Sequence, residues 1–365
     1  MGRSSRLTES GHRKHLSAAR EHDQGTSKHR RAARNVRRSG AMDAIENLAR
    51  VMAAVLVSAF AWPVAQAQPM QYPARPLRLV VPFTPGGGAD ISARQIAAKL
   101  SERLGQQVVV DNRGGGGGLI GMKITADAAA DGYSLLFTSA SYGAAIAARK
   151  SASAWLKGLT PVLQVGTSHY AIAAYPSLPG NLKDFLDLAR AKPGQLSYAS
   201  SGVGGLNHLA AELLLHMSKV KMLHVPYKGV GPAMTDLFVG RTSMLMTTPI
   251  SLLPHFRSGK LRALAVTGAT RMPELPDVPI AADTVPGYVV NSWYAVLVPG
   301  GTPRTVVDTL NAALNKVVNQ RDLKKNFQSL GIDITGGTPE RLAEVVHDDY
   351  QRWSTVVKNA GITLD

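Results

Sequence analysis

Two glycine-rich turns in this sequence have the residue types needed to hold an anion. Residues Pro85–Gly88 separate an apolar strand from a helix expected over about 90–104, and residues 200–205 repeat the arrangement in the second half of the chain. Glycine lets a ligand approach the backbone N–H groups closely, and the N-terminus of a helix favours negative charge. Ser200 and Ser201 add hydroxyl donors to the second turn. Chain reversal alone explains one such turn, but two at equivalent positions predict a carboxylate held between two lobes.

The same turns do not match the motifs of a nucleotide-binding or hydrolytic enzyme. The sequence has no G-x-x-x-x-G-K-[ST] motif, and residues 85–90 lack the G-x-G-x-x-G spacing, although Asp111 stands about 20 residues further on. A nucleophile elbow needs glycine two residues before the serine, and Ala199 occupies that position before Ser201. A nucleotide-dependent or hydrolytic α/β enzyme is therefore the disfavoured alternative, and we expect no catalytic residue and no cofactor.

Metal binding is also disfavoured by the residue types available. Cysteine is absent, and the six histidines after residue 67 include no pair at the i, i+4 spacing of a helical metal site. His208 stands out, because it lies in the first turn after residues 200–205. Trp293 and Tyr294 either pack in the core or form an aromatic wall of the ligand cleft. We therefore expect no metal ion, and we keep His208 and Trp293 as candidate ligand contacts.

The N-terminal segment indicates an export signal rather than a part of the fold. Residues 1–41 are rich in Arg, His and Ser, contribute much of the formal net charge of +16, and are also compatible with a nucleic-acid-binding arm. They precede an uncharged, mostly apolar stretch, Val51–Ala65, which ends in the small-x-small sequence Ala65-Gln66-Ala67. This order is typical of a secretory signal peptide cleaved after Ala67. We therefore expect a periplasmic protein without residues 1–67 that binds no nucleic acid, while the start of translation, at Met1 or later, stays open.

The rest of the chain alternates expected strands and helices, which is typical of an α/β protein with parallel sheets. The expected strands lie near 77–83, 108–110, 133–138, 196–199, 222–225, 243–246, 261–266 and 293–298. The expected helices lie near 90–104, 119–130, 182–191, 206–217, 232–239, 251–258, 303–318 and 339–359. The length of 365 residues suits two domains. We expect the chain to pass between two lobes near 167–173 and again near 288–294.

Short motifs from Tyr72 to the end of the chain resemble the Bug family, the periplasmic solute-binding proteins of tripartite tricarboxylate transporters, also called TctC-like proteins. These motifs are collinear with the family's and cover nearly all of this part of the chain. They are Tyr72–Pro76, Val80–Asp90, Asn112-Arg113, Asp131–Leu136, Tyr198–Gly202, His224–Gly229, Gly259–Thr267, Leu275–Pro279 and Gly336–Glu340.

The resemblance implies an α/β protein with the type II periplasmic-binding-protein fold, in which two lobes enclose a ligand cleft and the chain crosses between them twice. It places the first lobe in residues 68–167 and 289–365 and the second lobe in residues 168–288. It also implies a monomer without catalysis that captures a small organic carboxylate and delivers it to the membrane permease subunits of such a transporter. A periplasmic ligand sensor for a signalling partner is the alternative left open.

The resemblance implies further that backbone groups and ordered waters hold one carboxylate of the ligand. Its contacts come from residues 83–90, from the loop after the third strand and from the loop around 200–205. With the candidates named above and the cleft-facing pair at 247–248, the expected ligand-binding residues are Phe83, Thr84, Gly87, Gly88, Asp90, Ser139, Ser141, Ser200, Ser201, Gly204, His208, Thr247, Thr248 and Trp293.

Two departures from the family pattern bear on this site. Five glycines at 114–118 follow Asn112-Arg113, where relatives have a less glycine-rich turn, so we expect a looser loop here. At Thr247-Thr248 many relatives carry Asp-Asn facing the cleft. Loss of that acid removes a group able to pair with a cationic ligand, which favours a plain dicarboxylate or an aromatic acid over an amino acid.

Overall fold

The computed structural model describes residues 42, 44–53, 72–149 and 158–359. The chain divides into two compact units, Met1–Pro69 and Met70–Asp365. In the first unit residues 44–53 are helical, whereas most of the expected signal peptide, including its cleavage site at Ala67, lies outside the described residues. Within the described ranges, no helix combines the length and the apolar character that a membrane span requires.

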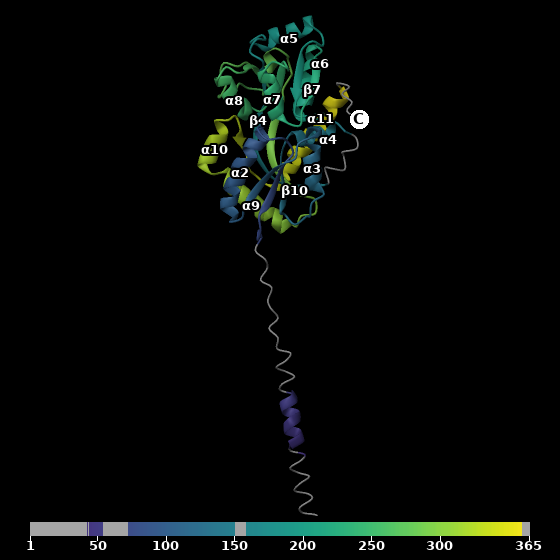
Figure 1. Cartoon of the computed structure of the whole chain (residues 1–365), viewed down its shortest axis with the longest axis vertical. Helices are drawn as coiled ribbons and strands as arrows, with labels where there is room; N and C mark the ends of the chain where they lie inside the picture. The colour runs from purple at the N-terminus through teal and green to yellow at the C-terminus, as the bar shows by residue number, and fades with distance from the viewer. Residues whose placement is uncertain (1–41, 43, 54–71, 150–157, 360–365) are drawn as a thin grey trace, which may run out of the picture. The chain divides into compact units, whose positions relative to one another are not determined.

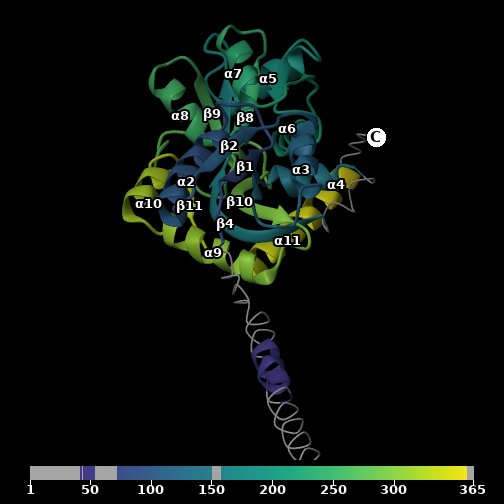
Figure 2. The same cartoon turned by 60° about the horizontal axis from the view of Figure 1, so that its bottom comes forward.

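The second unit is built on two β-sheets with helices packed around each of them (Figures 1 and 2). The six-stranded sheet has the order β11-β4-β10-β3-β1-β2, and the five-stranded sheet has the order β7-β6-β8-β5-β9. We call the six-stranded sheet with its helices the first lobe, and the five-stranded sheet with its helices the second lobe. The fold is therefore a two-lobed α/β fold, as the sequence predicts.

The first lobe uses both ends of this unit, and the second lobe uses its middle. The first lobe contains β1 (Leu77–Val81), α2 (Gly88–Leu104), β2 (Val108–Asn112), the short turn η1 (Gly116–Gly118), α3 (Leu119–Ala126), β3 (Ser134–Ser139), α4 (Ser141–Ala147), β4 (Leu159–His169), β10 (Asn291–Pro299), α9 (Arg304–Val318), α10 (Arg321–Gln328), β11 (Asp333–Ile334) and α11 (Pro339–Asn359). The second lobe contains β5 (Ala171–Ala174), α5 (Leu182–Ala191), β6 (Ser197–Ser200), α6 (Leu206–Ser218), β7 (Leu223–Pro226), α7 (Val230–Phe238), β8 (Met244–Thr247), α8 (Pro249–Arg257) and β9 (Arg262–Val266). The exact lobe limits given above stay a prediction.

The apolar run of β1 shows why the larger sheet is buried on both faces. Leu77, Leu79 and Val81 belong to the core cluster that α2 and α9 complete, whereas Val80 belongs to the cluster that contains Met122 of α3. Successive side chains of a strand point to opposite faces, so a continuous apolar run provides a core on each side.

The expectation of parallel sheets is correct for only part of each sheet. β1 pairs in parallel with β2 and β3, and β6 pairs in parallel with β7 and β8. β10 runs antiparallel to β3 and β4, and β5 runs antiparallel to β8 and β9. β4, β5 and β10 flank the passages between the lobes, so they are free of the crossover helices that make neighbouring strands parallel.

Two passages of the chain connect the lobes, and one threonine joins them. Tyr170 is the single residue between β4 and β5, and Val290 immediately precedes β10. Thr267 follows β9; its N–H donates to the Tyr170 carbonyl, and its Oγ1 accepts from the Tyr170 N–H (2.9 Å) and donates to the Val290 carbonyl (2.7 Å). These bonds hold both passages side by side at the centre of the unit.

A partly buried carboxyl group lies in the first lobe where α11 meets β10 and α4. Trp293 donates from Nε1 to Asp349 Oδ2 (3.2 Å), and a Cβ built on Gly143 would lie 3.3 Å from the same oxygen. Burial raises the pKa of Asp349 to about 7, although the Trp293 hydrogen bond and the Arg352 charge act in the opposite direction. The folded protein therefore keeps this carboxyl protonated in an acidic range where the unfolded chain has already ionised it.

We expect Asp349→Asn to make the protein more stable than wild type at pH 8. A raised pKa means that wild-type stability is greatest below about pH 4 and falls by up to about 1.4 kcal/mol per pH unit until the folded-state pKa near 7. Asparagine keeps an acceptor for Trp293 and does not ionise. The variant should therefore lack the loss of stability between about pH 4 and pH 7 that comes from ionisation of Asp349. Urea unfolding at pH 5, 6, 7 and 8 measures it, with exposed Asp348→Asn as control. Equal pH slopes for wild type and Asp349→Asn would contradict the assignment.

Candidate functional site

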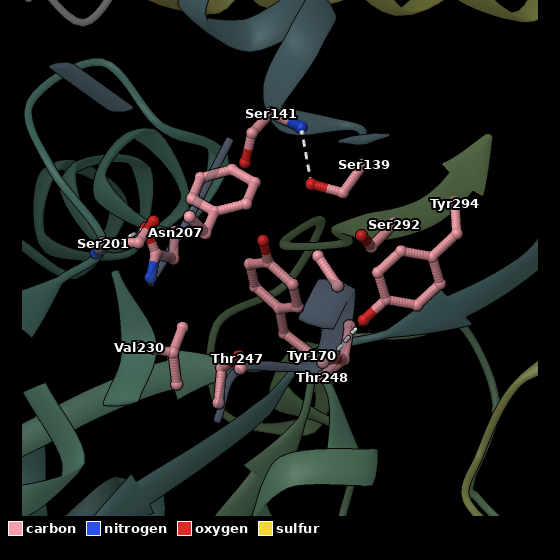
Figure 3. Close-up of a pocket in the computed structure, with 14 residues that line it drawn as sticks. Ser139, Ser141, Tyr170, Ser201, Asn207, Val230, Thr247, Thr248, Ser292 and Tyr294 are labelled. Atoms are coloured by element: carbon pink, nitrogen blue, oxygen red, sulfur yellow. Dashed lines mark hydrogen bonds between the residues drawn. The ribbon is translucent and has the colours of Figure 1, made fainter. Parts of the chain in front are cut away.

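A cavity of about 390 Å³, its open mouth included, lies between the two lobes (Figure 3). Figure 3 shows Ser201 and Asn207 on one side of it, Ser292 and Tyr294 on the other, and Tyr170 between them. Of the described residues that line it, none carries a charged side chain. The lining residues are Phe83, Gly87, Gly88, Ala89, Ser139, Ser141, Tyr170, Ser201, Asn207, Val230, Thr247, Thr248, Ser292 and Tyr294.

The first lobe contributes three segments to the wall of the cavity. The turn between β1 and α2 brings Phe83 and residues 87–89, and the turn between β3 and α4 brings two serines. β10 brings Ser292 and Tyr294, which are two residues apart on the strand and therefore lie on the same face of the sheet. Tyr170, in the first passage between the lobes, completes this wall.

The second lobe contributes residues at the ends of its strands and the beginnings of its helices. Ser201 follows β6, and Asn207 is the second residue of α6. Val230 is the first residue of α7, Thr247 ends β8, and Thr248 is the N-cap of α8. The carboxyl ends of neighbouring parallel strands meet at one edge of a sheet, which is why segments far apart in the sequence meet here.

Several helix N-termini meet at this uncharged cavity. α2, α6, α7 and α8 each begin at, or next to, a residue of the lining. The first N–H groups of a helix have no partner inside the helix, and its N-terminus carries about half a unit of positive charge. The N-caps Gly87, Gly205 and Thr248 make no side-chain hydrogen bond to these groups. The arrangement is suited to an anion such as a carboxylate.

Ser201 and Asn207 orient each other on the second-lobe side. The N–H and the Oγ of Ser201 both donate to Asn207 Oδ1, at 3.2 and 2.9 Å, and both residues are buried. Because Oδ1 is occupied by these two donors, the Nδ2 group is the end of the amide left to donate to a ligand.

Two hydrogen bonds join the lobes at the cavity wall. Thr248 Oγ1 lies 2.6 Å from Tyr294 Oη, and the Leu206 N–H at the start of α6 donates to Ser141 Oγ at 3.2 Å. Burial raises the pKa of Tyr294 far above the ordinary tyrosine range. Burial, together with the neighbouring Tyr294, does the same to the pKa of Tyr170. Both phenols are therefore neutral at neutral pH, and the lobes meet here through uncharged hydroxyls.

Gly88 occupies a position where the backbone must pass close to both lobes. A Cβ built on Gly88 would overlap the hydroxyls of Thr248 and Tyr294, and it would lie 2.8 Å from Ile250. At the neighbouring Gly87 the nearest atom to such a Cβ is Val230 Cβ, at 3.2 Å. Gly88 is therefore required by the space between the lobes, and Gly87 much less so.

The turn at 200–205 is backed by a stack of three rings, none of which lines the cavity. His224 lies between Tyr198 and His208, with ring centroids 4.8 and 4.0 Å away. Its Nε2 lies 2.6 Å from Ser200 Oγ, and His208 Nδ1 accepts from a backbone N–H of the turn. Burial lowers the pKa of His208, and burial together with His208 lowers that of His224 to about 3. Both imidazoles are therefore neutral at neutral pH.

The short Ser200–His224 contact resembles a nucleophile and its base, but its position does not suit catalysis. Ser200 is fully buried and does not line the cavity, and its Oγ also accepts from the Gly202 N–H at 3.1 Å. A base whose pKa is near 3 accepts a proton poorly at neutral pH. The contact is better explained as part of the framework of the turn.

The glycine run at 114–118 makes a contact that was not expected from the sequence. Instead of a loose loop, the structure has the turn η1 packed against residues 203–205. Gly117 has φ +67°, and a Cβ there would lie 2.6 Å from the Val203 carbonyl oxygen. A Cβ on Gly114 would likewise lie 2.5 Å from the Lys228 carbonyl oxygen. The glycines let the turns of the two lobes meet backbone to backbone.

The cavity brings together more than half of the residues predicted from the sequence. Phe83, Gly87, Gly88, Ser139, Ser141, Ser201, Thr247 and Thr248 line it, whereas Thr84, Asp90, Ser200, Gly204, His208 and Trp293 do not. Whether the lining residues contact a ligand stays a prediction. Ser200, Gly204 and His208 belong to the framework that supports the second turn. The sequence does not show which residues near the turn support it and which face the cavity.

Trp293 and Asp90 are used for structure. Trp293 lies on the face of β10 opposite to Tyr294 and bonds Asp349. The Asp90 carboxylate accepts from the Gly86 N–H (3.1 Å), from Arg94 (3.0 Å) and from Asn112 (3.0 Å), so it closes its own turn. Burial alone would raise the pKa of Asp90, but these hydrogen bonds together lower it.

Thr84 lies on the outer side of the contact between the lobes. It lines an open groove with residues that include Lys228 and Arg149. Its Oγ1 is buried and has no hydrogen-bond partner among the described residues, because Gly229 of the second lobe covers it. The six-residue loop between β1 and α2 contributes to both the cavity and this groove, and no local pattern in the sequence indicates which of its residues faces which.

Five lining residues were not predicted from the sequence: Ala89, Tyr170, Asn207, Val230 and Ser292. Tyr294 was considered with Trp293 as an aromatic wall but was not kept among the expected contacts. Strand alternation carried a usable signal for Ser292 and Tyr294, since a strand that buries Trp293 on one face presents these two residues on the other. Asn207 beside the second turn was a second signal. Tyr170 carried none, because its place depends on the passage between the two sheets.

The sequence matches a known protein family and is similar to several known proteins. The family model described as "Tripartite tricarboxylate transporter family receptor" matches residues 92–362. A UPF0065 protein from the tcbD–tcbE intergenic region of Pseudomonas sp. (strain P51) is 38% identical over 78% of this chain and 86% of its own length. Protein BugT of Bordetella pertussis is 36% identical over 80% of this chain and 91% of its own length.

Several solved structures are similar to this chain over most of its length. The periplasmic binding protein BugD is 32% identical, with a TM-score of 0.78 over 80% of this chain and 99% of its own. An R. palustris protein with adipate is 35% identical, with a TM-score of 0.77 over 80% and 99%. MatC from Rhodopseudomonas palustris, with bound malate, is 31% identical, with a TM-score of 0.75 over 78% and 100%.

Proposed function

Because this chain belongs to the tripartite tricarboxylate transporter receptor family, a family of periplasmic solute-binding proteins, we propose that it captures a small organic carboxylate between its lobes and delivers it to a membrane permease. The adipate and malate in two similar structures support a carboxylate as the ligand. The family description, a receptor of a transporter, supports delivery of the bound ligand to a permease.

The observation that carries the proposal is a neutral cavity at which five helices begin, the short α4 among them with Ser141 as its first residue. An anion there meets the N-termini of α2, α6, α7 and α8 and the hydroxyls of the lining, and no side chain of the lining repels it. We propose Gly87 and Gly88, through their backbone N–H groups, and Asn207, through Nδ2, as direct contacts of one carboxylate, with Ser201 orienting the Asn207 amide. Thr247 and Thr248, which offer no charge, favour a ligand without an amino group.

The arrangement supports binding rather than chemistry on the ligand. Ser201, the serine of the second turn that lines the cavity, bonds an amide oxygen rather than a base. A serine activated for attack needs a base within hydrogen-bond reach. We therefore propose that the ligand leaves the cavity unchanged.

We expect small carboxylates to bind with micromolar affinity, and we expect binding to depend on their charge. Thermal-shift screening of a panel that includes malate, adipate and aromatic acids identifies a ligand, and calorimetry measures its Kd. A ligand at about 100 times its Kd stabilises the folded state by about 2.7 kcal/mol. Adipamide is the uncharged control for adipate. Absence of a shift with every acid, or equal binding of adipamide and adipate, would argue against the proposal.

We expect Gly88→Ala to abolish binding of the acid identified above, because the added methyl group forces Thr248 and Tyr294 apart. Gly87→Ala is the matched control, and it should weaken binding far less because its Cβ meets only the Val230 side chain. Ser201→Ala should weaken binding by roughly tenfold, because it removes one of the two hydrogen bonds that orient the Asn207 amide. Calorimetry on the three variants checks the order, and Gly88→Ala binding like wild type would place the ligand elsewhere.

We also propose that residues 1–67 are removed on export to the periplasm. The apolar stretch Val51–Ala65 followed by Ala65-Gln66-Ala67 supports it. N-terminal sequencing of the protein from a periplasmic fraction should begin at Gln68. Mature protein that retains residues 1–41 would overturn this proposal.

A further inference from the structure

The turn at 200–205 needs an external framework to keep one shape. Its residues Gly202 and Gly204 have φ values of +130° and +81°. Glycine adopts such values readily but adopts many others as well, so the residue type does not fix the backbone of the turn. Yet this turn presents Ser201 to the cavity, and its Gly202 packs against Gly117 of the first lobe. Small changes in its backbone would move both contacts.

His224 fixes the first half of the turn through Ser200. Its Nε2 lies 2.6 Å from Ser200 Oγ, and that oxygen accepts the Gly202 N–H at 3.1 Å. The Tyr198 ring lies nearly parallel to the imidazole, with an interplanar angle of 13°. The orientation of the imidazole on β7 is thereby transmitted to the amide that follows Ser201.

His208 fixes the second half of the turn directly. Its Nδ1 accepts the Gly204 N–H at 3.2 Å, which requires that Nδ1 carry no proton. The imidazole proton is then on Nε2, which lies 4.0 Å from Glu212 of the same helix, and Glu212 also accepts the Tyr198 hydroxyl. The two imidazoles stack at 4.0 Å with an interplanar angle of 15°, so each restrains the plane of the other.

We propose that His208 and His224 are positioning residues for ligand binding, which as a stacked pair hold the turn at 200–205 in the conformation that presents Ser201 to the ligand and meets Gly117. Neither imidazole lines the cavity, so both act through the amides of Gly202 and Gly204. The inference rests on the proposed function, since it concerns affinity for the same ligand.

Asparagine and glutamine distinguish the two nitrogen atoms of an imidazole. Asparagine places its Oδ1 as many bonds from Cα as Nδ1 of histidine, and glutamine places its amide one bond further out, near the position of Nε2. His208→Asn should therefore keep the acceptor for Gly204, and His208→Gln should lose it. His224→Gln should keep the partner of Ser200, and His224→Asn should lose it.

The test measures the Kd for adipate or malate and the melting temperature of all four variants. We expect His208→Gln and His224→Asn to bind about tenfold more weakly than wild type, with His208→Asn and His224→Gln within about threefold. All four lose the ring stack, so their melting temperatures should fall by similar amounts. Affinity losses that ignore the Asn–Gln pattern, or that follow the melting temperature, would overturn the inference.

Amide hydrogen exchange measured by NMR gives a second readout that needs no ligand. Exchange at Gly204 should be at least tenfold faster in His208→Gln than in His208→Asn, and exchange at Gly202 should be faster in His224→Asn than in His224→Gln. Equal exchange within each pair would overturn the inference. A wild-type protein that binds neither adipate nor malate would count against these ligands, while the exchange rates would still decide the role of the histidines.

Discussion

The cavity between the lobes has no charged side chain in its lining, so backbone dipoles and hydroxyl groups must stabilise the anion that we propose it binds. The architecture around the site fits this constraint. The N-termini of α2, α6, α7 and α8 meet there because the carboxyl ends of the parallel strands in both sheets point toward the space between the lobes. No arginine is needed in the lining, and the neutral phenols of Tyr170 and Tyr294 do not repel an anion.

Close approach of the two lobes depends on glycine at a few points. Gly88 leaves room for the hydroxyls of Thr248 and Tyr294, and Gly117 lets η1 meet the backbone at 203–205. A Cβ at Gly88 would overlap both hydroxyls of the Thr248–Tyr294 hydrogen bond, and a Cβ at Gly117 would lie 2.6 Å from the Val203 carbonyl oxygen, so a side chain at either position requires these contacts to shift. The lobes stay connected at Thr267, which ties both passages of the chain in one place.

From the sequence alone, the polar residues that support the site cannot be distinguished from those that line it. Asp90, His208 and Trp293 have the chemistry expected of ligand contacts, yet each satisfies a partner inside its own lobe. A buried polar group has a high cost when it lacks a hydrogen bond, so the residues that support a polar cavity must themselves be polar. For this reason residue type alone does not separate the lining from its framework.

The sequence by itself determined the alternation of strands and helices, the two glycine-rich turns between strand and helix and the two-lobed class, because these depend on local periodicity and on glycine between a strand and a helix. Only the tertiary structure decided which residues of each turn face the cavity. It also placed Tyr170 and Tyr294 in the wall and gave the glycine run at 114–118 its contact with the opposite lobe. Those features depend on how two sheets face each other across passages distant in sequence, and no local pattern contains that relation.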